Sequence, residues 1–267
     1  MAVYHLLDAI PPAEHAAVAD FTSTYDVTSA FNAMMAISGP KRIELPFGRI
    51  CIGNRINMED NTDLVGNRTE LFSLAAADGG NPTQASIWCE HKNGWRILGK
   101  IRVNGNRSNR STTGGEAAIS VTGGEEFSLQ DMQVVHAVGD GLSVGGDGTA
   151  HHRRAKVGTV ERCVFEACGR NGISISGAYD MNFVSNRTRG QNSNSPQTGT
   201  SLEPNNAINF NENINFFGHS SVQNANWDLA IVDGYGLNRG IRFFGGRVIK
   251  ISNLTGVDAG FWGTLRS

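Results

Sequence analysis

The feature that most constrains this chain is a repeat in its middle, where three similar segments follow one another at nearly equal intervals. The segments are GDGLSVGG (139–146), RNGISISG (170–177) and TGTSLEPNN (198–206). When Gly141, Gly172 and Gly199 are taken as equivalent, the steps between them are 31 and 27 residues. Repeats of this length indicate a solenoid, in which each unit buries its apolar side chains only by stacking on its neighbours.

Within each segment, apolar and polar residues alternate as they do along a β-strand, and the stretches 158–169 and 180–191 between them have the same character. Short strands without intervening helices also suit a sandwich or a barrel, but the repeat favours a parallel β-helix. The alternation predicts that one set of side chains points inward: Leu142, Val144, Ile173, Ile175, Thr200 and Leu202. It predicts that two columns point outward, the first formed by Ser143, Ser174 and Ser201 and the second by Gly145, Ser176 and Glu203.

Residues 1–38 differ in pattern and are expected to form an N-terminal arm with a capping helix. Asp26 and Thr28 precede an apolar pattern with helical spacing, which predicts an N-capped amphipathic helix near residues 27–37 and a shorter one at 12–19. Gly39 and Pro40 end this region. The helix would cover the open end of a β-helix formed by residues 39–267, the two parts making one structural unit.

Composition narrows the classes of function. The chain has 33 glycines among 267 residues and only 18% charged residues, which suits tight turns between many short strands. The net charge of −2 argues against a nucleic-acid partner. No apolar run approaches the 20 or so residues of a membrane span, and no signal peptide is expected. The four cysteines have no metal-binding spacing and are expected to be buried thiols.

Several segments resemble a known family. Residues 10–36, KRIELPFGRICI (41–52), INMEDNTDLVG (56–66) and IRVNGNR (101–107) are similar to pectate-lyase-like right-handed parallel β-helix proteins, and the opening resembles phage tailspike depolymerases in particular. The similarity covers residues 10–250. It implies an all-β, right-handed parallel β-helix, a polysaccharide substrate, a homotrimer, and a place on a virion tail or outside the cell.

One position departs from the pattern of that family. The motif behind TSLEPN usually has Asp where this chain has Ser201. A mechanism that needs this carboxylate is therefore open to question.

The candidate catalytic residues are Glu203, Asp140 and Arg170. Glu203 is the carboxylate on the outward columns, whereas Asp140 and Arg170 lie at their N-terminal corner. Two carboxylates two rungs apart are separated by about 10 Å, which suits an acid and a base with a water between them, as in inverting glycoside hydrolysis. The candidate substrate-binding residues are Asn171, Ser174, Ser201, Asn205, Tyr179, Asp233 and Tyr235.

Several functions stay open at this point. Hydrolysis is slightly favoured over lyase chemistry, in which Arg170 would neutralise a uronate carboxylate beside a base. The alternatives are a non-catalytic glycan-binding tail protein or adhesin, which Ser201 favours, and a uronate C5-epimerase. No cofactor or resident metal is expected, although Ca²⁺ bridging substrate carboxylates is open.

Overall fold

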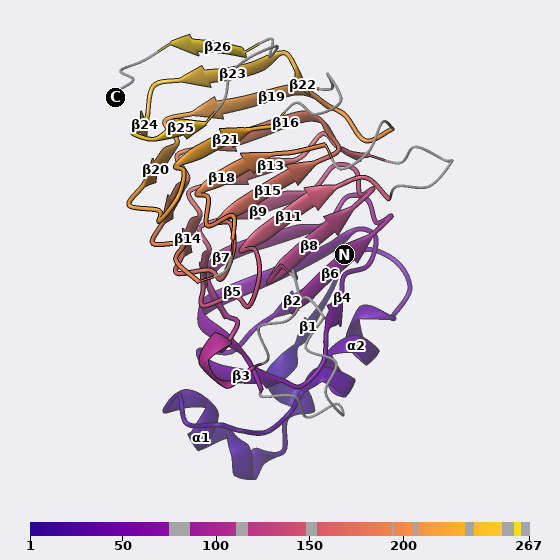
Figure 1. The fold of residues 1–267 in the computed structure, drawn as a ribbon. Coiled ribbons are helices and arrows are strands. Elements are labelled where there is room, and N and C mark those ends of the chain that lie inside the picture. Colours follow the sequence, from indigo (N-terminus) through magenta and orange to yellow (C-terminus); the bar gives the residue numbers. More distant parts are fainter. Residues whose placement is uncertain are drawn as a thin grey trace.

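The computed structural model describes residues 1–74, 86–110, 117–147, 154–193, 195–204, 208–232, 238–252 and 259–262. The chain coils into a right-handed parallel β-helix, as predicted, with its N-terminal helices at one end and its C-terminus at the other (Figure 1). All pairings between described strands are parallel, and each strand pairs with its equivalents in the turns before and after it.

The first of the two sheets has eight strands and carries the three repeats found in the sequence. Its strands, in chain order, are β4 (Ile56–Asn57), β6 (Ile87–Glu90), β8 (Ile119–Thr122), β11 (Leu142–Gly145), β15 (Ile173–Ser176), β18 (Thr200–Leu202), β21 (Leu229–Ile231) and β25 (Ile251–Ser252). Leu142 pairs with Ile173, and Ile173 with Thr200, so the register inferred from the glycines is the register of the structure.

The second sheet has eighteen strands and wraps around the rest of the coil. Its strands are β1 (Ala2–His5), β2 (Lys41–Glu44), β3 (Gly48–Ile52), β5 (Thr62–Ser73), β7 (Arg96–Asn104), β9 (Ser128–Gln130), β10 (Gln133–Val135), β12 (Ala155–Lys156), β13 (Thr159–Glu161), β14 (Val164–Glu166), β16 (Ala178–Val184), β17 (Arg187–Arg189), β19 (Asn211–Phe217), β20 (Ser220–Val222), β22 (Asn238–Arg239), β23 (Ile241–Phe244), β24 (Arg247–Val248) and β26 (Ala259–Trp262).

The N-terminal region contains the predicted helix and one strand that was not predicted. The helical segments are η1 (Leu6–Ala9), η2 (Pro12–Glu14), α1 (His15–Ala19) and α2 (Thr28–Met35). The Asp26 carboxylate accepts a hydrogen bond from the backbone N–H of Thr28, at 2.9 Å, and Phe31 and Met35 on α2 are buried in the core. Strand β1 pairs with β2, so the coil already begins at residue 2.

A column of three glycines lets successive turns approach closely at the start of the eight-stranded sheet. A Cβ atom on Gly141 would lie 2.6 Å from the carbonyl oxygen of Gly172, and one on Gly172 would lie 2.6 Å from that of Gly199. Real Cβ atoms do not approach backbone this closely. The glycines of the repeat therefore set the spacing of the turns at the corner where the candidate site lies.

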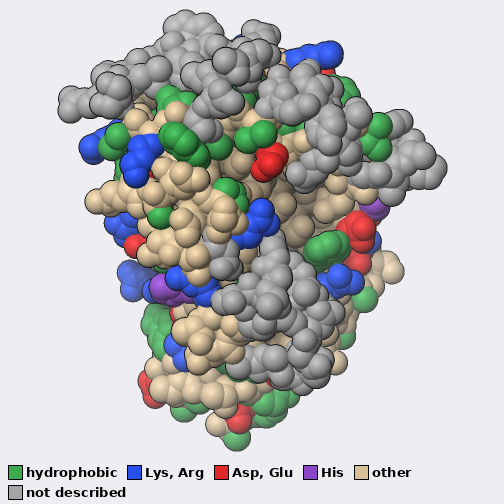
Figure 2. Space-filling view, viewed as in Figure 1, with side chains coloured by type: hydrophobic (Ala, Val, Ile, Leu, Met, Phe, Trp, Pro, Cys, Tyr) green, Lys and Arg blue, Asp and Glu red, His purple; other side chains and the backbone are tan. Residues whose placement is uncertain are grey.

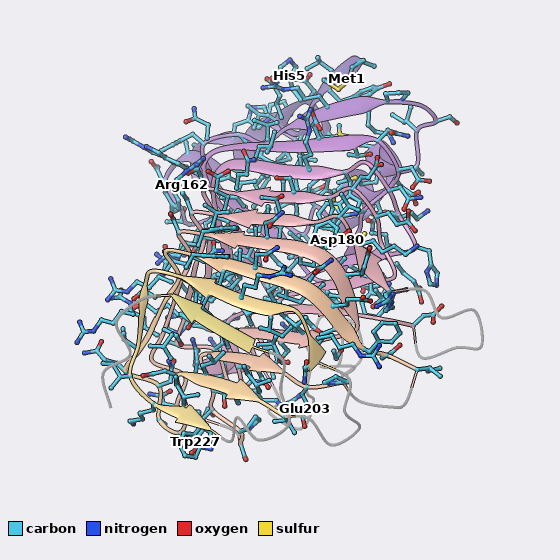
Figure 3. The ribbon with its side chains drawn as sticks, turned by 90° about the horizontal axis from the view of Figure 1, so that it is seen from above. Met1, His5, Arg162, Asp180, Glu203 and Trp227 are labelled. Atoms are coloured by element: carbon cyan, nitrogen blue, oxygen red, sulfur yellow. The ribbon has the colours of Figure 1, made fainter. Side chains whose placement is uncertain are left out.

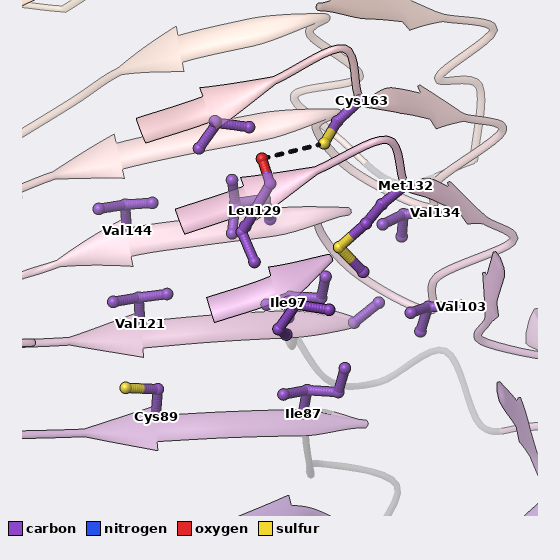
Figure 4. Packing of buried hydrophobic residues seen from close by; sticks show 14 of the residues in the cluster. Ile87, Cys89, Ile97, Val103, Val121, Leu129, Met132, Val134, Val144 and Cys163 are labelled. Atoms are coloured by element: carbon purple, nitrogen blue, oxygen red, sulfur yellow. Dashed lines mark hydrogen bonds between the residues drawn. The ribbon is translucent and has the colours of Figure 1, made fainter. Parts of the chain in front are cut away.

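The core consists of like side chains stacked along the coil axis (Figure 4). Phe183, Phe216 and Phe243 occupy equivalent positions, with ring centroids 4.9 and 4.4 Å apart and nearly parallel planes. The four cysteines are buried free thiols, as the sequence predicted, and burial raises the pKa of Cys89, Cys163 and Cys168 to about 12. Within the described part of the chain, no helix is long and apolar enough to span a membrane.

Candidate active site

The candidate site lies at the corner where the chain enters the eight-stranded sheet. Four residues stack there in successive turns. The glycine that follows each of the first three donates its backbone N–H to the carbonyl of the stacked residue in the next turn. Gly141 donates to the carbonyl of Asn171, Gly172 to that of Thr198, and Gly199 to that of Trp227. Asp140, Asn171, Thr198 and Trp227 therefore form one column.

Asp140 is held firmly within this column. It is 4% exposed; its Oδ1 accepts a hydrogen bond from the Asn171 backbone N–H at 2.9 Å, and its Oδ2 accepts one from the Ser174 hydroxyl at 2.8 Å. The Asn171 side chain donates to Ser174 and accepts from the Thr198 backbone N–H. These contacts fix the direction of the Asp140 carboxyl and join three turns.

The surroundings of Asp140 favour its protonated form. Burial raises the pKa of Asp140 above its usual range, because the ionised carboxylate loses its hydration. Arg170, whose Nε lies 3.9 Å from Oδ1, opposes this rise in pKa, as do the hydrogen bonds from Asn171 and Ser174. The negative charge of Glu203 adds to the rise. A buried carboxyl with a raised pKa is suited to donating a proton.

A cavity of about 200 Å³ brings the three candidate catalytic residues together. Asp140, Arg170 and Glu203 line it, with Ser143, Ser174 and Ser176 among the remaining lining residues. Glu203 directly follows β18, and its backbone N–H donates to the carbonyl of Ile175, which places it beside Ser176 in the outward column. Asp140 is buried, whereas the Glu203 side chain is exposed.

A second cavity of about 310 Å³ shares Arg170 and Glu203 with the first, so the two are adjacent parts of one groove. Ser201, Trp227 and Val232 line this second part. Trp227 is 38% exposed, and Figure 3 shows it on the same side of the molecule as Glu203. In the space-filling view of this face, uncharged side chains and backbone predominate and charged groups are sparse (Figure 2).

Ser201 lies in the predicted column but differs from its neighbours in exposure. It pairs with Ser174 and Ala230, yet it is 1% exposed, whereas Ser143 and Ser174 are partly exposed. Its hydroxyl has no hydrogen-bond partner among the described residues. Ser201 is among the residues that line the second cavity, but its hydroxyl oxygen is itself buried.

Of the other predicted binding residues, the structure describes only Tyr179. Tyr179 is on β16, in the eighteen-stranded sheet, where the Arg154 guanidinium lies 5.2 Å from its ring centroid. It is therefore not on the sheet that carries Glu203, because the chain turns at Gly177 between β15 and β16. Asn205, Asp233 and Tyr235 lie outside the described residues. No group of three or more potential metal ligands occurs among the residues that the structure describes.

Trp227 is the groove residue that sequence reasoning missed. A fourth repeat, WDLAI (227–231), follows the same pattern as DGLSV, NGISI and TGTSL, but Asp228 stands where the other three have glycine. That substitution hides the repeat. Aligning Leu229 with Thr200 would have placed Trp227 in the column of Asp140.

Fold and groove together define a class: right-handed parallel β-helices with a polar groove along one sheet. No protein-family model and no curated protein matches this chain. Among solved structures, it is similar to the A-module of the mannuronan C-5 epimerase AlgE4 of Azotobacter vinelandii, with a TM-score of 0.69 and 14% identity, over 96% of this chain and 68% of that one.

Two further similar structures act on polysaccharides according to their descriptions. The tailspike gp49 of Acinetobacter baumannii bacteriophage Fri1, a capsular polysaccharide depolymerase, has a TM-score of 0.62 and 16% identity, over 98% of this chain and 46% of that one. An iota-carrageenase complexed to iota-carrageenan fragments has a TM-score of 0.60 and 14% identity, over 94% and 52%. These likenesses confirm the predicted resemblance at the level of the fold, and this chain spans about half of the latter two.

Proposed function

We propose that the protein binds and depolymerises an acidic or complex bacterial surface polysaccharide, with hydrolysis as the favoured reaction. The observation that carries this proposal is that Asp140, Arg170 and Glu203 line one cavity in a groove of small polar residues. The groove follows the outward columns of a parallel sheet, and an extended chain of sugars fits such a surface. Structural neighbours that act on polysaccharides support the substrate class.

In this proposal the two carboxyl groups have different tasks. Asp140, with its raised pKa, donates a proton to the glycosidic oxygen, and Glu203 accepts a proton from the attacking water. The two residues belong to turns two rungs apart, about 10 Å along the coil axis, and stand in different columns. We expect inversion at the anomeric carbon, because the alternative, a close nucleophile pair, needs a shorter separation. Arg170 binds an anionic substituent of the sugar and limits the rise in the pKa of Asp140.

Two related reactions use the same residues. If the substrate is a uronate, Arg170 can neutralise its carboxylate while Glu203 removes the C5 proton. Departure of the C4 glycosidic oxygen, protonated by Asp140, then completes elimination, whereas return of a proton to the opposite face of C5 completes epimerisation. The likeness to an epimerase module keeps that reaction among the candidates.

A second class of function is glycan binding without cleavage, as in a tail protein or adhesin. Ser201 favours it, because this position carries a hydroxyl where the resembling family has a carboxylate. The firm hydrogen bonding of both Asp140 oxygens is also compatible with a purely structural role.

The resemblance to tailspikes further leads us to propose a homotrimer located on a virion tail or outside the cell. A mass of three times 28.6 kDa by light scattering is expected. A monomer at micromolar concentration would contradict the trimer without bearing on the chemistry of the groove.

The reaction is tested by incubating the protein with a panel of capsular polysaccharides and exopolysaccharides and analysing the products. New reducing ends without unsaturation indicate hydrolysis, and unsaturated uronate absorbance indicates a lyase. Unchanged length with altered uronate composition indicates an epimerase. Binding with no change in the polymer would contradict catalysis. Ser201→Asp is included because gain of cleavage only in this variant would identify a binding-only form of an enzyme.

A further inference from the structure

A second and larger groove, of about 850 Å³, lies on the eighteen-stranded sheet, where β3, β5, β7, β10 and β14 follow one another. Its lining includes five cationic and two acidic side chains, an excess of three positive charges on a chain whose net charge is −2. The five cations are Arg49, Arg68, Lys100, Arg102 and Arg162.

Both carboxylates in this groove are already engaged. Glu70 is 7% exposed and accepts hydrogen bonds from Arg49 Nε at 2.8 Å and from Asn104 Nδ2 at 3.0 Å. Asp131 receives two hydrogen bonds from the Arg162 guanidinium, at 2.7 and 2.9 Å, which lower the pKa of Asp131. The charges of Glu70 and Asp131 therefore do not neutralise all five cations of the groove.

Arg68 and Lys100 carry the charge that is left over. Both side chains are exposed, and neither forms an ion pair with any residue in the described part of the chain. They are neighbours, because Lys100 pairs with Asn67 and Arg68 is the extra residue of a β-bulge between Asn67 and Thr69. Arg102, 46% exposed, is only 3.7 Å from the Glu70 carboxylate and already shares it.

Amide and apolar side chains lie beside the cations in this groove. Arg102 and Gln133 occupy one column in adjacent turns, about 4.8 Å apart, and Asn104 also lines the groove. Ile101 and Met132 are buried beneath them. Phe21, packed edge-on against Phe47 at 5.3 Å, also lines this groove. Cations, amide groups and apolar surface side by side match a sugar ring, which has apolar faces, hydroxyls and, in acidic polymers, an anionic substituent.

We propose that this basic groove is a second binding site for an acidic polysaccharide, recognised through its carboxylate or sulfate groups. It lies on a different side of the molecule from Glu203, as the positions of Arg162 and Glu203 in Figure 3 show. The proposal does not depend on cleavage at the first groove. A second site would hold a charged polymer on the protein surface independently of the groove at Glu203.

The test uses calorimetric titration of the whole protein with polygalacturonate, which carries carboxylates, dextran sulfate, which carries sulfates, and neutral dextran. The double variant Arg68→Asn/Lys100→Gln removes two charges without breaking an ion pair, and Asn tolerates the left-handed conformation of residue 68 (φ 55°). We expect about fivefold weaker binding of one or both acidic polymers, the range for two exposed charged contacts.

A matched variant makes the result specific. Arg55→Gln removes a partly exposed cation outside this groove, whose guanidinium lies over Trp88, and it should leave the affinity unchanged. Unchanged affinity in the double variant, an equal loss in Arg55→Gln, or binding of neutral dextran as tight as that of the acidic polymers would overturn the proposal. Tighter binding of duplex DNA through Arg68 and Lys100 would overturn it in favour of a nucleic-acid site.

Discussion

Trp227 shows how a single residue can shape the proposed groove. It stacks in the column of Asp140 and lines the cavity beside Glu203, yet 38% of its surface remains exposed. A large aromatic ring left open beside polar groups provides an apolar face on which a sugar ring can stack. Burial alone therefore does not explain its presence at this position.

We expect Trp227→Ala to weaken binding of the polysaccharide by about 1 kcal/mol, or about fivefold in Kd, because an aromatic contact of this kind is lost. The measurement is a titration with a bound but uncleaved oligosaccharide. Phe217→Ala is the matched control, since Phe217 is 39% exposed but lies on β19 in the other sheet. Equal losses in the two variants would argue against a glycan contact at Trp227.

His219 makes stability depend on pH. It is 1% exposed, one ring nitrogen lies 2.9 Å from the Thr200 hydroxyl, and burial lowers its pKa to about 4. Its pKa in the unfolded chain is about 6.5, so between pH 6.5 and 4 the unfolded state takes up a proton that the folded state does not. Neutral His219 thus makes its full contribution to the free energy of unfolding above pH 6.5, and this contribution is lost as the pH falls towards 4.

The free energy of unfolding should accordingly fall by up to about 3 kcal/mol over that interval because of this residue alone. Urea unfolding at several pH values, compared between the parent protein and His219→Gln, isolates the effect from the titration of carboxylates. The variant should show a flatter dependence on pH. Parallel curves for the two proteins would mean that His219 is protonated with little penalty in the folded state.

At the scale of the element, the turn spacing depends on the glycine column that begins the eight-stranded sheet. A methyl group on Gly172 would meet the Gly199 carbonyl oxygen at 2.6 Å and the Thr188 side chain at 2.9 Å. Both neighbours are fixed, one as backbone and the other as a fully buried side chain. The corner that holds Asp140 and Asn171 in position cannot yield without moving them.

We therefore expect Gly172→Ala to destabilise the protein by about 1–3 kcal/mol, the usual cost of overpacking, and to lower activity as well. Chemical unfolding measures the first effect. Gly145→Ala is the control, because a methyl group there meets only the Ser176 hydroxyl, which can rotate away. A Gly172→Ala variant as stable as Gly145→Ala would show that the turns can separate without cost.

Much of the fold, and the position of the candidate site on it, could be predicted from the sequence. In a parallel coil, equivalent residues stack in register, so the spacing of Gly141, Gly172 and Gly199 also predicts the outward columns. What could not be predicted depends on contacts between turns of unequal length. The burial of Ser201, the turn that carries Tyr179 onto the other sheet, and the basic groove built from residues between 21 and 164 are of this kind.

At the scale of the whole molecule, the coil places the two grooves on two different sides. One side carries a narrow groove with Asp140, Arg170 and Glu203, and another carries the broader basic groove. The N-terminal helix α2 covers one end through Phe31 and Met35, so the stacked core is not open to water there. In our proposals, such a scaffold holds both grooves in fixed positions for binding an extended polymer.

The central claim is that Glu203 acts chemically at the narrow groove, and Glu203→Gln tests it most directly. The matched control is Glu90→Gln, because Glu90 lies in the same outward column on β6, four turns away, and does not line the cavity. Release of reducing ends from a polysaccharide that the parent protein cleaves should fall by at least about 100-fold in Glu203→Gln. It should be unchanged in Glu90→Gln. Cleavage by Glu203→Gln at the parent rate would contradict the account.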